Sequence, residues 1–317
     1  MAKSLQKRTL DCATPRLDLV VQEMVGLSRA IVRGMFDHGC VRVNGAPCDQ
    51  AGASAAAGAI IEVSWEVGRR YKEVPRTRVS QAFRVAYEDA HLIVVEKVAG
   101  VLTVPTLRGE QNTLVHEVAH HFSKSARITQ RACIVHRLDR DTSGLLVFTR
   151  REDIAQALKQ QFADHKPERE YAAIVAGRLP EDRGTFRSFL ATDEDLDQYS
   201  TPDASEGKLA VTHYEVVERL RGATFVRVRL ETGRRNQIRV HFAEAGHPVL
   251  GDVRYEVERA RHPAWREKRL ALHAKTLGFK HPVTGLPVRV TSELPKVFTA
   301  FLAATGLTDR AQGPRRP

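Results

Sequence analysis

The chain has 317 residues, 42% of them hydrophobic, and a net charge of +11 at pH 7. It contains no run of about 18 apolar residues, which excludes a membrane-spanning helix, and its first residues predict no secretion signal. The positive charge favours a polyanionic partner, either a nucleic acid or an anionic membrane surface.

The cysteines are scattered along the chain and form no C-x-x-C pair; they are Cys12, Cys40, Cys48 and Cys133. This spacing suggests neither a zinc knuckle nor a redox motif. We expect reduced thiols in a cytoplasmic protein.

Shifts in composition divide the chain into four segments. They are a small unit over 1–63, a basic linker over 64–81, a large body over 82–305 and a disordered tail over 306–317. The linker contains proline, and the tail is rich in arginine and proline.

The small unit is predicted to begin with two amphipathic helices. Apolar residues recur at helical spacing over 17–24 and 31–36. Ser28 can cap the second helix, and Gly39 can end it in a left-handed conformation. The stretch CVRVNGAP alternates as a strand and turns at the Asn-Gly pair of residues 44–45, a strong hairpin signal, before AIIEV adds another strand.

Basic side chains gather on one side of this unit. Arg29 and Arg33 are four residues apart on the second helix, and Arg42 points outward from the next strand. Such an edge suits phosphate groups, although an ordinary solvated face has the same pattern. The stretch SRAIVRGMFDHGCVRVNG resembles the S4 domain, a small RNA-binding module, and the similarity covers residues 16–63.

The large body mixes strands and helices without a regular βαβ order. Strands are predicted over 83–89, 91–97, 134–138, 145–149, 169–179, 211–220, 223–232 and 270–282, and helices over 112–122, 153–164, 236–246 and 295–305. Strands outnumber helices, and short turns join several neighbours. The pattern predicts an α+β fold with a mixed, mostly antiparallel sheet.

One helix carries the spacing of a zinc-protease motif, H-E-x-x-H, at His116, Glu117 and His120. Its extended form needs glycine and histidine where this chain has Ser123 and Ala126. Without a third ligand we interpret the helix as a partly solvated surface and expect no metal.

Charged residues stand between two apolar runs in residues 134–150, IVHRLDRDTSGLLVFTR. Gly144 can take a positive φ or let another chain approach closely. The carboxylates and hydroxyls of 139–143 can bond to backbone donors within the turn. From residue types alone, a self-capped turn and a catalytic turn are equally good interpretations.

The same segment, HRLDRDTSGLLV, resembles the signature of the RluA-type pseudouridine synthases, and further blocks follow the family in order. They are YEDAHLIVVEKVAGVLTVP, REYAAIVAGRL, ETGRRNQIRVHFAEAGHPVLGD and RLALHAKTLGFKHPVTG. The resemblance covers about residues 16 to 303. It implies a pseudouridine synthase fold preceded by an S4 domain, and isomerisation of uridine in RNA, most often in large-subunit ribosomal RNA.

The resemblance also implies a set of catalytic residues. Asp139 is the carboxylate that acts at C1′ of a flipped-out nucleotide, as a nucleophile, as a charge stabiliser or as a base at the 2′ position. Asp141 is its local rival, since both side chains could face one side of an extended chain. Arg239 is expected to pair with the aspartate, and Tyr171 to stack on uracil and assist proton removal.

Other residues of these blocks are expected to contact RNA. They are Lys97, Arg137, Arg140, Thr142, Ser143, Arg234 and Gln237 in the body, besides Arg29, Arg33 and Arg42 in the small unit. Thr142 and Ser143 are also expected to shape the turn. The chemistry needs no cofactor or metal, and we expect a monomer whose partner is ribosomal RNA, with transfer RNA as an alternative.

Three positions depart from the family pattern, namely Val98 for proline, Arg235 for threonine and Asn236 for histidine. They leave the predicted catalytic atoms in place but put the choice of substrate in doubt. The alternative hypothesis is a non-catalytic RNA-binding or ribosome-assembly protein of the same fold.

Overall fold

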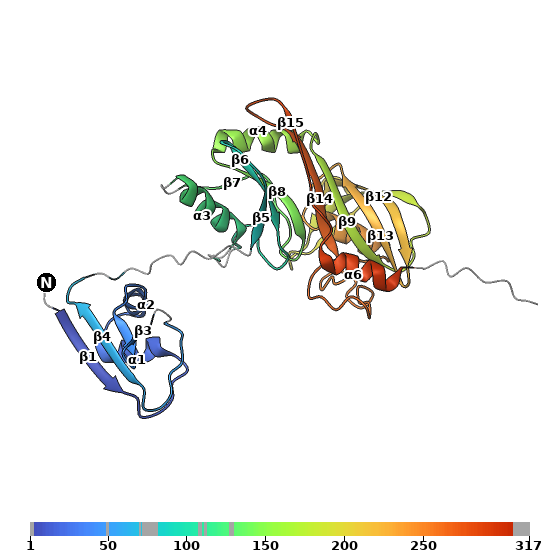
Figure 1. The fold of residues 1–317 in the computed structure, drawn as a ribbon. Helices are drawn as coiled ribbons and strands as arrows, with labels where there is room; N and C mark the ends of the chain where they lie inside the picture. Colours follow the sequence, from blue (N-terminus) through green and yellow to red (C-terminus); the bar gives the residue numbers. More distant parts are fainter. Residues whose placement is uncertain are drawn as a thin grey trace, which may run out of the picture. The chain divides into compact units, whose positions relative to one another are not determined.

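The computed structural model describes residues 3–48, 51–69, 71, 82–106, 110, 113–126 and 130–306. The chain forms two compact units, Met1–Val79 and Ser80–Pro317, and Figure 1 labels most of their helices and strands. Within the described residues, no helix is long and apolar enough to span a membrane.

The first unit packs two helices against a four-stranded sheet. Its elements are β1 (Lys3–Thr9), α1 (Leu17–Val25), α2 (Arg29–Asp37), β2 (Val41–Val43), β3 (Ala46–Pro47) and β4 (Ile60–Glu66), and the strand order is β1-β4-β2-β3. The apolar helix faces form the core with β4, since Val21, Val32 and Met35 are buried beside Ile61 and Val63. Both predicted helices and the hairpin are confirmed.

The local signals in this unit stand at the expected positions, although the Ser28 side chain makes no capping hydrogen bond. Ser28 stands at the N-cap of α2 with extended backbone, and Gly39 follows that helix with φ of +67°. Asn44 and Gly45 both have positive φ at the β2–β3 turn, as a type I′ hairpin requires.

Two boundaries of this unit were predicted wrongly. Strand β1 was missed because KSLQKRT lacks apolar alternation; Leu5 is exposed, and the strand pairs with β4 along its backbone. The linker was placed too early at 64–81, because β4 runs through Glu66 and Tyr71 packs into the core. Residues 72–81 of the expected linker lie outside the described residues.

The second unit is built on one large, mostly antiparallel sheet. Its strands are β5 (Phe83–Glu88), β6 (Leu92–Lys97), β7 (Cys133–Ile134), β8 (Ser143–Thr149), β9 (Glu168–Ala176), β10 (Arg183–Thr192), β11 (Gln198–Thr201), β12 (Lys208–Leu220), β13 (Ala223–Leu230), β14 (Leu272–Lys280) and β15 (Pro287–Thr291). The main path is β11-β10-β12-β13-β9-β14-β8-β6-β5, with β15 beside β14 and β7 beside β8. The α+β class with a mixed sheet is therefore confirmed.

Helices cover both faces of the β6–β8 part of this sheet. These two helices are α3 (Leu114–Ala126) and α4 (Glu152–Ala163) (Figure 1). The unit has two further helices later in the chain, α5 (Gln237–Glu244) and α6 (Lys296–Thr305). Ile93 and Phe148 pack with α3, whereas Leu92 and Val147 pack with Leu158 of α4. Burial on both faces explains why these strands are continuous apolar runs.

Several expectations in this unit need correction. The strand expected over 134–138 shrinks to Cys133–Ile134, and the rest of that stretch has no regular structure. Strands β10, β11 and β15 were not predicted. Gly306, which was expected to belong to the tail, pairs with Leu220, and residues 307–317 of the expected tail lie outside the described residues.

Candidate active site at the charged turn

The charged turn is held in place by Lys97, the last residue of β6, and by the segment after it. Lys97 is 1% exposed, and its Nζ donates to the carbonyls of Val98, Val101 and Arg140 at 2.8–3.0 Å. The amide of Gly100 donates to the same Arg140 carbonyl at 2.9 Å. Burial lowers the pKa of Lys97 to about 7, against the pull of nearby carboxylates. This lysine thus fixes the position of the turn, and its burial does not favour the predicted contact with RNA.

A second support comes from the parallel pairing of β8 with β14. Gly144 has φ of +112°, and a Cβ there would lie 2.2 Å from the carbonyl oxygen of Ala274. Gly144 therefore combines a positive φ with the close approach of another strand, the two features expected of it. Beside it, Ser143 is buried between His273 and Arg269, with its Oγ 2.8 Å from Nδ1 and 2.6 Å from Nη2.

His136, two residues before Leu138, supports the turn from its other end. Its Nε2 accepts the amide of Val147 at 3.2 Å, and its ring stacks on Phe162. Burial lowers its pKa to about 3, so the imidazole is neutral and its Nε2 is free to accept. The sequence argument assigned no role to this histidine.

Helix α5 places Arg239 opposite the turn. Its guanidinium donates to both oxygens of Asp252, at 2.6 and 2.7 Å, and to Asn236 Oδ1 at 3.1 Å. Nη1 also lies 3.3 Å from Asp139 Oδ2. Burial disfavours the charge of Arg239, but the bonds to Asp252 outweigh it and raise its pKa. The predicted pairing of Arg239 with Asp139 is present in the geometry, although Asp252 is the tighter partner.

Asp139 opens onto a small cavity of about 60 Å³. Tyr171 of β9, Thr142, Arg234 and Arg239 also line it. Tyr171 is 9% exposed, and burial raises the pKa of its hydroxyl, which is therefore a neutral donor. The cavity thus brings together a carboxylate, a phenol and a cation that come from three distant parts of the sequence.

The two carboxylates of the turn face different spaces. Asp139 lines the small cavity, whereas Asp141 lines a larger neighbouring one and bonds to Arg140 at 3.0–3.2 Å. Asp139 thus shares a cavity with Tyr171, whereas Asp141 does not. This geometry favours Asp139 over its rival.

The residues expected to contact RNA fall into two groups. Arg137 and Arg140 are exposed, and Arg234 is half-buried with its Nε on the Leu209 carbonyl at 2.9 Å. Arg29, Arg33 and Arg42 are exposed on the first unit, where Arg29 also pairs with the buried Asp18.

The second group is buried, so these residues do not form an exposed RNA-binding surface. Gln237 is 2% exposed and bonds to Thr232, Thr212 and the Val211 carbonyl. Ser143 is fixed as described above. Thr142 is also buried, and its Oγ1 has no hydrogen-bond partner among the described residues. Gln237 and Thr142 still line the small cavity, so their contact with RNA would have to be made there.

The three departures from the family pattern have clear structural roles. The amide of Val98 donates to the Ala82 carbonyl at 3.0 Å, a bond that proline could not make. Asn236 adopts a left-handed conformation with φ of +53° and bonds to Arg239 and to the Tyr255 hydroxyl. Arg235 donates to the Leu196 carbonyl. Asn236 is thus part of the site, where it helps to orient Arg239.

The zinc-like motif lies on α3, away from the turn. His116 bonds to Thr113 Oγ1 at 2.9 Å, while His121 pairs with Glu88 at 2.9 Å. The part of the chain that the structure describes holds no group of three or more residues suited to a metal ion.

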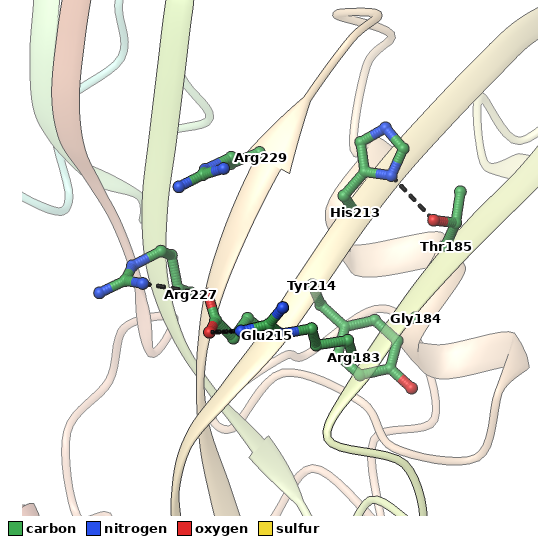
Figure 2. Close-up of a pocket in the computed structure, with 8 residues that line it drawn as sticks. All are labelled: Arg183, Gly184, Thr185, His213, Tyr214, Glu215, Arg227 and Arg229. Atoms are coloured by element: carbon green, nitrogen blue, oxygen red, sulfur yellow. Dashed lines mark hydrogen bonds and ion pairs between the residues drawn. The ribbon is translucent and has the colours of Figure 1, made fainter.

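A further hollow lies on the open sheet face formed by β10, β12 and β13 (Figure 2). Its floor is a ladder in which Glu215 pairs with Arg183 at 2.9 Å and with Arg227 at 3.0 Å. None of the predicted catalytic residues lines it. The chemistry-bearing groups are therefore concentrated at the charged turn.

Comparison with known proteins agrees with this arrangement. Residues 91–244 match the family described as RNA pseudouridylate synthase. The chain is 40% identical over 220 residues to a Zymomonas mobilis protein named ribosomal large subunit pseudouridine synthase D, covering 67% of this chain and 69% of that one. A protein of the same name from Vibrio parahaemolyticus is 32% identical over 313 residues, which is 91% of this chain and 90% of that one.

Solved structures support the fold. Human RNA pseudouridylate synthase domain containing 4 matches with a TM-score of 0.58 at 21% identity, covering 69% of this chain and 91% of the other. The human domain-containing 1 protein gives 0.55 at 22% identity, covering 71% and 88%.

Proposed function

The chain belongs to the RNA pseudouridine synthase family, and we propose that it converts uridines of large-subunit ribosomal RNA into pseudouridine. It is an enzyme that isomerises uridine within RNA. The names of its relatives from Zymomonas mobilis and Vibrio parahaemolyticus support the large ribosomal subunit as the source of the substrate. Its net charge of +11 suits such a polyanion.

We assign the central role to Asp139. The reaction breaks the C1′–N1 bond, turns the uracil and forms a C1′–C5 bond, so C1′ becomes electron-poor on the way. A carboxylate oxygen can attack that carbon, stabilise its charge or remove the 2′ proton. The observation that carries the assignment is the single 3.3 Å contact between Asp139 and Arg239. One long contact orients the carboxylate without occupying both of its oxygens.

Arg239 and Tyr171 complete the proposed set. Because Asp252 holds Arg239 with two short bonds, the guanidinium keeps its place when Asp139 moves toward a substrate. The Tyr171 ring can stack on the uracil, and its hydroxyl can assist proton transfer at C5. The target nucleotide must leave its RNA stack to reach this buried group.

We further propose that the first unit is an S4-type RNA-binding module. Its exposed Arg29, Arg33 and Arg42 support contact with phosphate groups. The catalytic set lies entirely within the second unit of one chain, which supports action as a monomer. We place that action in the cytoplasm, where ribosomal RNA is modified in bacteria.

Mapping of pseudouridines in ribosomal RNA tests this function. Cells that lack the protein should lose pseudouridine at one or more large-subunit positions, and the wild-type gene should restore it. An Asp139→Asn gene should not restore it, although the variant should still bind RNA. An unchanged map would contradict the proposed substrate. Restoration by Asp139→Asn would contradict the assignment of Asp139 as the reacting carboxylate, and Asp141→Asn would be tested next.

A further inference from the structure

A second, larger cavity adjoins the catalytic turn. It measures about 760 Å³ and is lined by Arg140, Asp141, Arg239 and most residues of 251–270. We name it the Trp265 pocket. Arg239 also lines the small cavity of Asp139, so the two spaces share it as a lining residue.

The wall of the Trp265 pocket is firmly built. Trp265 Nε1 donates to the Arg269 carbonyl at 3.1 Å, and its ring packs edge-on against Phe298 of α6. Gly251 lies so close that a Cβ would be 2.2 Å from the Arg269 carbonyl. Arg269 in turn donates to Ser143 at 2.6 Å. Both sides of the pocket are thus fixed to the catalytic turn before any ligand arrives.

The lining combines apolar surface with charged side chains of both signs, Asp141 and Glu267 among them. Trp265, Leu270 and Pro263 provide apolar area, and Val253 is 76% exposed at the rim. A ligand bound in the cavity would cover the exposed Val253 side chain and remove its apolar surface from water.

Cations stand around this apolar surface. Arg140 and Arg261 each pair with an acidic neighbour, but Lys268 has no ion pair within the described part of the chain. Its ammonium is therefore available to an anion. An apolar platform with a free cation at its edge matches a nucleobase and its phosphate, the combination that proteins use to hold unstacked RNA.

We propose that the Trp265 pocket binds the nucleotide next to the target uridine, with its base on the apolar floor and its phosphate near Lys268. This inference rests on the proposed function, since it assumes an RNA nucleotide at Asp139. The pocket then makes turnover depend on the flanking nucleotide as well as on the uridine. Its contribution is to affinity and to the choice of site.

The test uses synthetic fragments of large-subunit ribosomal RNA that carry the mapped uridine. In one fragment the nucleotide on its 5′ side is abasic, and in another the 3′ nucleotide is. For the wild-type full chain, one of the two abasic fragments should lower kcat/KM by about tenfold or more relative to the intact fragment. If both react like the intact fragment, the pocket holds no flanking base.

Val253→Asp places a charge on the apolar rim at an exposed position, so folding should be preserved. It should lower kcat/KM on the intact fragment by a similar factor and cause little further loss on the affected abasic fragment. The matched control is Val283→Asp, at another exposed valine far along the chain. Equal behaviour of the two variants, or losses that multiply on the abasic RNA, would overturn the proposal.

Lys268→Ala tests the phosphate contact separately. It should reduce the slope of log Kd against log salt concentration by about 1, whereas Lys296→Ala, which removes the same charge from α6, should leave the slope unchanged. Equal slopes for the two variants would contradict a phosphate at Lys268. If wild-type protein forms no pseudouridine in any fragment, the proposed function itself has failed, which these readouts distinguish from failure of the pocket.

Discussion

Arg239 holds Asp252 with two hydrogen bonds of 2.6 and 2.7 Å, although the two residues come from a helix and from a separate loop. This pair is the fixed part of the site. Asp139 Oδ2 lies 3.3 Å from Arg239 Nη1, and this looser contact leaves the carboxylate free to react. The position of Arg239 therefore depends on Asp252, whose carboxylate also accepts the backbone amides of Arg254 and Tyr255.

Asp252→Asn should weaken this arrangement without removing any proposed reacting group. An amide presents one acceptor and no charge, so Arg239 should turn toward Asp139 and hold it more tightly. We expect the single-turnover rate of pseudouridine formation to fall by about 100-fold, with RNA affinity unchanged. Filter binding and rapid-quench kinetics measure the two quantities. Asp195→Asn, at an exposed position, is the control, and a wild-type rate in Asp252→Asn would show that the pair is not needed.

The two aspartates of the turn should differ sharply. Asp139→Asn should lower the single-turnover rate by at least about 1,000-fold, because among the described residues no second carboxylate lines its cavity. Asp141→Asn should stay within about tenfold of wild type, because Asp141 bonds to Arg140 and faces the other cavity. The opposite ranking would move the reacting carboxylate to Asp141.

The sequence predicted the parts of this site that depend on neighbouring residues. The apolar runs around the turn indicated buried strands, and the glycine at 144 indicated both a positive φ and a close approach. Asp252 and Asn236 were missed as functional residues because their importance comes from a partner on another segment. Lys97 was predicted to contact RNA and its structural role was missed, since lysine is rarely buried and nothing local reveals the three carbonyls that surround it.

Gly144→Ala should destabilise the second unit strongly. The added methyl group would meet the Ala274 carbonyl at 2.2 Å, and backbone cannot move aside as a flexible side chain can. We expect the free energy of unfolding to fall by about 3 kcal/mol or more from strain and overpacking together. Gly285→Ala is the matched control, since φ is also positive there but the nearest atom is the end of Lys280 at 3.6 Å. That change should cost about 1 kcal/mol, and equal losses would remove the close approach as the cause.

Lys97 should make stability depend on pH. Burial lowers its pKa to about 7 in the folded protein, whereas a lysine in an unfolded chain titrates near 10.4. Between these values the unfolded state binds more protons, so the free energy of unfolding should rise as pH increases from about 7 toward 10. Below about pH 7 the full cost of the buried charge is present.

Lys97→Met isolates this contribution, because other groups titrate alike in both proteins. Denaturant unfolding at pH 7, 8 and 9 should show a steeper rise for wild type than for the variant. The methionine should also loosen the turn, since three carbonyls lose their donor, and turnover should fall while RNA binding persists. Parallel stability curves for the two proteins would mean that the three carbonyls hold Lys97 fully charged across this range. In that case the lysine would fix the turn equally well at every pH tested, and turnover would show no loss assignable to its deprotonation.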